Sequence, residues 1–363
     1  MNNPLFVTKV HLPPLSKYKE YLDKIWESGH ITNNGPFVRE LESKLSDRFS
    51  SNVNFVNNGT IALQIAIKAL DLHGEIITTP FSYVATTSSI VWENCKPKFV
   101  DIDPDYLCID ADKIEEAITE NTSAILATHV FGNPCDVIAI ESIAKKYNLK
   151  VIYDAAHAFD VQYLGKPLVS YGDISTVSFH ATKVFHTAEG GAVITNDEEL
   201  NFKIKYLRNF GHDGPLKFHG IGINAKCSEI HAAMGLSMLH EMDGVIESRQ
   251  KAYTTYKELL KGQDKLKCIP FRDEMNWNYS YFPVLIENEN LLTRLLDFLE
   301  TKNIYPRRYF YPSLNKLPYV DGKSCSISEN ISSRIICLPF HAYMPEESIE
   351  RTVEALKYFL NPA

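Results

Sequence analysis

The strongest constraint on the fold is a regular alternation of short apolar segments with amphipathic segments between about residues 55 and 195. The apolar segments are rich in Val, Ile and Thr, which predicts buried strands at residues 75–79, 98–102, 123–130, 150–153, 175–179 and 192–195. Apolar positions at helical spacing predict helices at residues 61–70, 110–118 and 136–147. Strands that alternate with helices form a mostly parallel sheet with helices on both faces. We therefore expect an α/β fold.

The pattern changes after about residue 225. Residues 228–262 predict one or two long helices, residues 278–286 a strand, and residues 290–301 and 346–359 two more helices. A chain of 363 residues is also long for a single hydrophobic core. We therefore expect a large domain over residues 1–240 and a smaller α+β domain over residues 241–363.

Charge and composition exclude several classes of partner. The formal net charge is −8 and no cluster of Lys and Arg exceeds a pair, so we expect no nucleic-acid partner. Apolar runs are far shorter than the roughly 20 residues that span a bilayer, and the first residues do not resemble a signal peptide, so we expect no membrane partner. The seven cysteines form no CxxC pair, which indicates reduced thiols in a cytoplasmic protein and no metal site.

Polar motifs follow the predicted strands, where open α/β sheets bind their ligands. Asn57-Asn58-Gly59-Thr60 begins a predicted helix, whose free N–H groups and dipole suit a phosphate; a plain helix cap is the alternative. Asp154 ends the strand at residues 150–153. Its carboxylate either pairs with the protonated ring nitrogen of a pyridoxal-phosphate (PLP) cofactor or caps a following helix.

Lys183 has an unusual setting for a lysine in a loop. It follows the apolar strand at residues 175–179, lies among small and aromatic residues, and precedes Gly190-Gly191, which lets backbones approach closely. Desolvation in such a setting lowers the pKa of an amine, so that the amine acts as a nucleophile and proton carrier. A solvated surface lysine is the alternative.

Two aromatic side chains near these motifs have two possible roles. His157 comes three residues after Asp154, and Tyr83 follows the predicted strand at residues 75–79. Each is either a cofactor contact or a packed core residue.

Motifs along nearly the whole chain resemble one known family. The segments NNGTIAL, TPFSYVAT, THVFGNP, YDAAHAFD, SFHATKVFHTAEGGA, LRNFGHDG, GINAKCSE, YFPVLI and YPSLNKLPY resemble the DegT/DnrJ/EryC1/StrS family of nucleotide-sugar aminotransferases. The resemblance implies PLP as cofactor, the aspartate-aminotransferase-like (fold type I) architecture for the large domain, and an obligate homodimer with two shared active sites.

The resemblance also implies a role for each matching residue. Lys183 looks like the lysine that binds PLP covalently and moves the proton, and Asp154 is similar to the partner of the pyridine nitrogen. The remaining matches are His157 beside the ring, Tyr83 stacked on it, Gly59, Thr60 and Ser178 at its phosphate, and Asn224 at the phosphate of the neighbouring subunit. Lys226 stands where the family usually has Arg, which puts a bidentate contact there in doubt.

The substrate expectations rest on two further segments. The residues after Lys183 resemble the branch that forms 4-amino-4,6-dideoxyglucose, which predicts transfer from L-glutamate to dTDP-4-keto-6-deoxyglucose for a surface polysaccharide such as the lipopolysaccharide O-antigen. We expect His186, Arg307 and Tyr311 near this sugar nucleotide. The alternatives are amination at C3, another PLP chemistry such as desulfuration, and a non-catalytic regulator.

Overall fold

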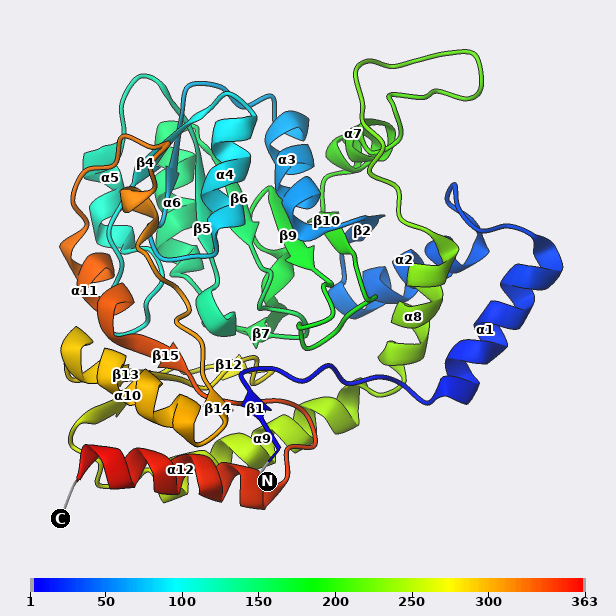
Figure 1. The fold of residues 1–363 in the computed structure, drawn as a ribbon. Helices are drawn as coiled ribbons and strands as arrows, with labels where there is room; N and C mark the ends of the chain where they lie inside the picture. The colour runs from blue at the N-terminus through cyan, green and yellow to red at the C-terminus, as the bar shows by residue number, and fades with distance from the viewer. Residues whose placement is uncertain (1–2, 362–363) are drawn as a thin grey trace.

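The computed structural model describes residues 3–361, with a seven-stranded sheet at the centre of its larger half (Figure 1). In spatial order the strands are β2 (Asn52–Val56), β10 (Gly191–Thr195), β9 (Ile174–Ser178), β6 (Lys150–Asp154), β5 (Thr122–Thr128), β3 (Glu75–Thr78) and β4 (Lys96–Phe99). Within this sheet β10 runs antiparallel to both neighbours, and the pairs among β9, β6, β5, β3 and β4 are parallel. The predicted α/β fold with a mostly parallel sheet is confirmed.

Helices pack on both faces of this sheet. They are α3 (Gly59–Ala69), α4 (Val84–Trp92), the 3₁₀ turn η1 (Ala111–Lys113) with α5 (Ile114–Ala117), α6 (Val137–Tyr147) and α7 (Glu198–Leu207). Side chains cap two of them: Asn58 accepts a hydrogen bond from the Ile61 N–H (2.9 Å) and Asp136 accepts one from the Ala139 N–H (3.0 Å). The sequence analysis predicts α3, α5 and α6 but not β2, α4 or α7.

Two N-terminal helices, α1 (Leu15–Ser28) and α2 (Pro36–Phe49), pack against α8 (Glu229–Leu239). The fully buried Glu229 of α8 accepts hydrogen bonds from the N–H groups of Phe37 (2.8 Å) and Val38 (3.0 Å), so it caps the start of α2. Before these helices, β1 (Leu5–Phe6) pairs in parallel with β14 (Ile304–Tyr305). The start of the chain therefore crosses to the C-terminal half.

The C-terminal half has a sheet and a core of its own. The antiparallel strands β11 (Leu266–Cys268), β13 (Pro283–Ile286) and β15 (Ile335–Cys337) pack with α9 (Met242–Leu259), α10 (Glu289–Thr301), α11 (Ser326–Arg334) and α12 (Glu346–Leu360). Figure 1 shows α9, α10 and α12 below the large sheet. A separate cluster of buried side chains within residues 252–360 forms this core. The predicted domain boundary near residue 240 falls between α8 and α9, and it stays a prediction.

Shorter elements connect the two halves. A small sheet contains β12 (Met275–Asn276), β7 (Gln162–Tyr163) and β8 (Lys166–Pro167), and the remaining 3₁₀ turns are η2 (Val130–Gly132), η3 (Leu168–Ser170) and η4 (Leu314–Lys316). The predicted strand at 278–286 begins only at Pro283. Asn278 instead donates hydrogen bonds to the carbonyls of His157 (2.9 Å) and Phe159 (2.7 Å). The segment before Pro283 is therefore bonded to the large half and does not pair with β11.

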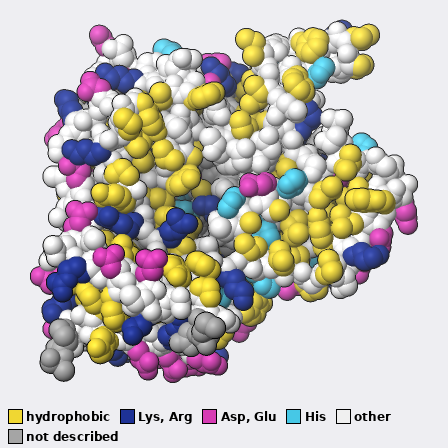
Figure 2. Space-filling model, viewed as in Figure 1, with side chains coloured by type: hydrophobic (Ala, Val, Ile, Leu, Met, Phe, Trp, Pro, Cys, Tyr) yellow, Lys and Arg dark blue, Asp and Glu magenta, His cyan; other side chains and the backbone are white. Residues whose placement is uncertain are grey.

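An extended segment, residues 211–222, projects from the body beyond α7 (Figure 1). Hydrophobic side chains gather on this projection and beside α1 (Figure 2), and Leu216 and Ile221 are each 90% exposed. Within residues 3–361, no helix has the length and apolar character needed to cross a membrane.

Candidate active site

A cavity of about 500 Å³ lies at the carboxyl ends of the parallel strands. The large sheet brings the residues that follow β2, β3, β5, β6 and β9 to this edge, as expected for ligand sites in open α/β sheets. They include Asn58, Gly59, Thr60, Ser82, Tyr83, Thr128, Asp154, His157, Ser178, His180 and Lys183. The C-terminal half completes the wall with Tyr281, Arg307, Tyr309 and Phe310.

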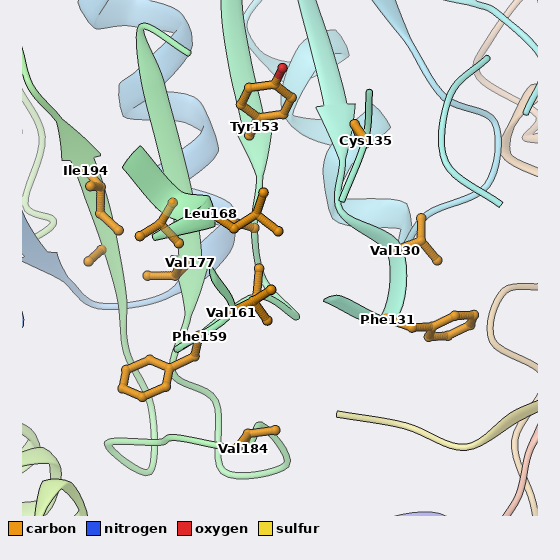
Figure 3. Close-up of a cluster of buried hydrophobic side chains, with 14 of the residues drawn as sticks. Val130, Phe131, Cys135, Tyr153, Phe159, Val161, Leu168, Val177, Val184 and Ile194 are labelled. Atoms are coloured by element: carbon orange, nitrogen blue, oxygen red, sulfur yellow. The ribbon is translucent and has the colours of Figure 1, made fainter. Parts of the chain in front are cut away.

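Lys183 lies in a loop beyond β9 that buried neighbours hold in place. Val184 and Phe185 are buried, and the Phe185 ring stacks on Phe159 with ring centroids 4.4 Å apart. Figure 3 shows Val177 on β9 and Val184 in the loop beyond it, with Phe159 beside them. Burial lowers the pKa of the Lys183 amine to about 8, and the nearby charge of Asp154 opposes this effect. Lys183 is therefore not a solvated surface lysine.

Asp154 is the last residue of β6 and is 6% exposed. Its Oδ2 accepts a hydrogen bond from the Thr86 hydroxyl (2.7 Å) and its Oδ1 accepts one from the Ala156 N–H (3.1 Å). Burial raises the pKa of the carboxyl, while these hydrogen bonds and the Lys183 charge lower it. Residues 155–161 form turns and no helix, so Asp154 is not a helix cap.

His157 is a neutral histidine in the cavity wall. Burial lowers its pKa well below the usual range, and the Lys183 charge adds to this effect. Its Nδ1 accepts a hydrogen bond from the Phe131 N–H (3.1 Å), so the proton of the neutral ring is on Nε2. The rings of Phe131 and Phe310 lie nearly parallel to it, with interplanar angles of 3° and 6°.

Free hydrogen-bond donors gather at the start of α3. Within the described residues, the N–H groups of Gly59 and Thr60 and the Ser178 hydroxyl have no hydrogen-bond partner. A Cβ on Gly59 would lie 2.9 Å from the Ser178 Cβ, so only glycine permits this close approach of α3 to β9. The start of a helix with free N–H groups and a hydroxyl beside it is a suitable site for a phosphate.

Comparison with known proteins assigns the chain. Residues 16–357 match the DegT/DnrJ/EryC1/StrS aminotransferase family. The chain belongs to this family. It is 44% identical over 364 residues to the dTDP-4-amino-4,6-dideoxy-D-glucose transaminase of Shigella dysenteriae. This match covers 98% of this chain and 99% of that protein.

Two further relatives agree with this assignment. The chain is 40% identical over 369 residues to the Escherichia coli protein with the same name, covering 96% and 97% of the two chains. The crystal structure of DesI in the presence of its TDP-sugar product superimposes with a TM-score of 0.95 at 30% identity, over 100% of this chain and 94% of that one. The predicted family and aspartate-aminotransferase-like fold are confirmed.

Of two further residues with a role implied by the family resemblance, Tyr83 lines the cavity and Asn224 does not. Tyr83 precedes α4 and lines the cavity with its side chain 59% exposed, which leaves the ring available to a ligand. Asn224 is exposed and is not part of the cavity lining in its own chain. Its Oδ1 accepts a hydrogen bond from the Lys226 ammonium (2.9 Å), which lies 4.6 Å from the centre of the Phe210 ring.

Of the three residues expected near the substrate, one lines the cavity and two lie outside its lining. Arg307 lines the cavity, and within the described residues its guanidinium has no hydrogen-bond partner. His186 is buried outside the lining, with Nε2 bonded to the His11 carbonyl (2.7 Å) and Nδ1 to the Ala188 N–H (3.2 Å), so both ring nitrogens serve the backbone. Tyr311 is also outside the lining, with the Arg308 guanidinium 3.5 Å from its ring centre.

Several lining residues escaped the sequence analysis. Ser82 lies in the short segment between β3 and α4, and Thr128 is the last residue of β5, so a polar signal was available in the sequence. Tyr281, Tyr309 and Phe310 come from the C-terminal half, and only the tertiary fold brings them to the cavity.

Proposed function

We propose that this aminotransferase uses PLP to move the amino group of L-glutamate to C4 of dTDP-4-keto-6-deoxyglucose, giving dTDP-4-amino-4,6-dideoxyglucose. The observation that carries the chemistry is the shared cavity of the Lys183 amine and the Asp154 carboxylate. The substrate is supported by the names of the relatives at 44% and 40% identity, which match nearly the full length of this chain.

The cavity fits PLP by the chemistry of its side chains. The free donors of Gly59, Thr60 and Ser178 suit the phosphate, and the buried carboxylate of Asp154 suits a protonated ring nitrogen. The exposed ring of Tyr83 would pack on the cofactor. The volume of about 500 Å³ is in the range of small-molecule sites.

When bound, PLP supplies an electron sink for charge that develops on the carbon that carries the transferred amine. Asp154 holds the proton at the ring nitrogen, because its two oxygens accept hydrogen bonds that stabilise the ionised form. Lys183 takes a proton from the substrate carbon and returns one, since an amine with a pKa of about 8 exchanges protons readily near neutral pH. The Nε2–H of His157 provides a neutral hydrogen-bond donor in the same wall.

The active unit in this proposal is a homodimer with two shared sites. Asn224 lies outside the cavity of its own chain, which supports a role in the site of a second copy. The projection at residues 211–222 exposes Leu216, Phe218 and Ile221, and a partner subunit would cover such apolar side chains. All seven cysteines are free thiols, which agrees with a cytoplasmic location.

A substrate panel tests the proposal. The enzyme, PLP and L-glutamate are incubated separately with dTDP-4-keto-6-deoxyglucose, its 3-keto isomer, and the GDP- and UDP-linked 4-keto sugars. NMR of each product locates the amine. We expect amination at C4 of the dTDP sugar. Product from the 3-keto isomer alone contradicts the carbon assignment, and preference for a GDP or UDP sugar contradicts the nucleotide.

A further inference from the structure

Three buried hydroxyl groups form a chain that ends on Asp154. The Thr86 Oγ1 lies 2.7 Å from the Asp154 Oδ2, the Ser82 Oγ lies 2.7 Å from the Thr86 Oγ1, and the Thr128 Oγ1 lies 3.2 Å from the Ser82 Oγ. All three hydroxyl residues are buried, and they come from α4, from the loop before it and from the end of β5. Ser82, Thr128 and Asp154 line the cavity, and Thr86 links them from behind the lining.

The ionised carboxylate fixes the direction of every hydrogen bond in this chain. A carboxylate can only accept, so Thr86 must donate to Asp154. The Thr86 oxygen then accepts from the Ser82 hydroxyl, which in turn accepts from Thr128. Hydroxyls that donate in one direction polarise one another, which strengthens the last bond of the chain. The hydroxyl chain therefore delivers a strengthened donor to one carboxylate oxygen.

We propose that Thr86 is a positioning residue that keeps Asp154 ionised and oriented toward the ring nitrogen of the cofactor, and that Ser82 and Thr128 reinforce it. The inference rests on the proposed PLP chemistry and deepens it. Burial alone favours the neutral carboxyl, which cannot hold a ring nitrogen in its protonated form. Donors to the carboxylate oxygens lower the pKa and so oppose this preference, and Thr86 is the side chain that provides one.

A purely structural link between α4 and β6 is the competing explanation, and the chain contains a matched control for it. Thr87 is the next residue of α4 and is fully buried. Within the described residues its hydroxyl has no hydrogen-bond partner. Thr87→Val therefore removes a buried hydroxyl from the same helix without any change in the contacts of Asp154.

The test compares Thr86→Val, Thr86→Ser and Thr87→Val as PLP-loaded enzymes. PLP labelled with ¹⁵N in the ring reports the protonation of the ring nitrogen by its NMR chemical shift. In Thr86→Val we expect the shift to move toward the unprotonated form and kcat to fall about ten- to hundredfold, as for loss of a hydrogen bond to a charged group. KM for the sugar nucleotide should change by less than about threefold, because Thr86 is not part of the cavity lining. Thr86→Ser and Thr87→Val should retain the protonated signal.

Several results would overturn the inference. A protonated nitrogen and unchanged kcat in Thr86→Val contradict it, as does a loss of kcat without any change at the nitrogen. Equal effects of Thr86→Val and Thr87→Val would show that only packing matters. If Thr86→Val does not fold, Ser82→Ala gives the same test. We then expect a smaller change of the ¹⁵N chemical shift in the same direction. An unchanged chemical shift in Ser82→Ala would contradict the inference. Failure of the wild-type protein to bind PLP refutes the proposed function itself, which keeps the two failures distinct.

Discussion

Lys183 follows strand β9 and Asp154 ends the neighbouring parallel strand β6, and each residue offsets part of the effect of burial on the pKa of the other. Burial lowers the pKa of the amine to about 8, and Asp154 raises it; burial raises the pKa of the carboxyl, and Lys183 lowers it. Within the described residues no direct ion pair joins them. Two groups of opposite charge therefore share one cavity while both remain available to a ligand.

Lys183→Ala should fold yet lose the covalent link to PLP that borohydride reduces. Lys183 is the lysine that lines the cavity, so no other amine in the lining can replace it. Mass spectrometry of the reduced wild-type protein should locate the adduct on Lys183. An adduct on a different lysine would show the assignment to be wrong.

The shifted pKa of Lys183 also predicts how the stability of the cofactor-free protein depends on pH. Between pH of about 8 and 10.5 the unfolded chain binds more protons at this amine than the folded chain, so this group makes the free energy of unfolding rise with pH. Below pH of about 8 the amine is protonated in both states, so the buried cation lowers the free energy of unfolding by a constant amount. Lys183→Met should therefore stabilise the cofactor-free protein at pH 7 by about 1 to 3 kcal/mol.

Urea unfolding of both proteins at pH 7 and pH 10 measures this effect. The difference between Lys183→Met and the wild type should shrink at the higher pH, because the wild-type amine is then neutral in the folded state. An equal difference at both pH values would show that Lys183 titrates normally.

The strand-end motifs were predictable because parallel strands bring their carboxyl ends to one edge. Asp154 and Lys183 are separated by many residues in sequence, and the strand pattern indicates that both can reach one crevice; in the structure Asp154 ends β6 and Lys183 follows the adjacent strand β9. The position of His186, by contrast, could not be predicted from the sequence. Its position near Lys183 in sequence predicts a site residue, but two backbone hydrogen bonds hold it outside the cavity lining, and no local pattern reveals those partners.

Of the elements missed by the sequence analysis, helix α7 has apolar residues at helical spacing (Leu200, Ile204 and Leu207), whereas helix α4 lacks such a pattern. Helix α4 contains Thr86, Thr87 and Ser89 on its buried side, so the usual apolar stripe of a packed helix is absent. Of these three residues, Thr86 donates a hydrogen bond to Asp154 (2.7 Å). The C-terminal wall with Tyr281 and Tyr309 could not be predicted for another reason: its contacts with the large sheet join segments far apart in sequence.

Asp154→Asn should retain PLP but lose at least about a few orders of magnitude in kcat. An amide cannot hold the ring nitrogen in its protonated form, so the cofactor becomes a weaker electron sink. The proposed phosphate donors at Gly59 and Thr60 are unchanged, which is why PLP should stay bound. The absorbance of bound PLP and the steady-state rates measure both effects. Near-normal turnover in this variant would leave Asp154 with a structural role only.

Mixed dimers of Asn224→Ala and Lys183→Ala chains test whether the active sites are shared. If Asn224 serves the site of the partner, one site of the mixed dimer carries both lesions and the other carries neither. The mixed dimer should then recover about half of the wild-type activity at limiting PLP, although each parent dimer is impaired at both sites. Differently tagged chains allow the mixed dimer to be purified, and the two parent dimers treated in the same way are the controls. If Asn224 instead serves its own chain, each site carries one lesion and no intact site forms. Verified mixed dimers without recovered activity would therefore contradict the shared-site proposal, which rests on the position of Asn224 outside the cavity lining of its own chain.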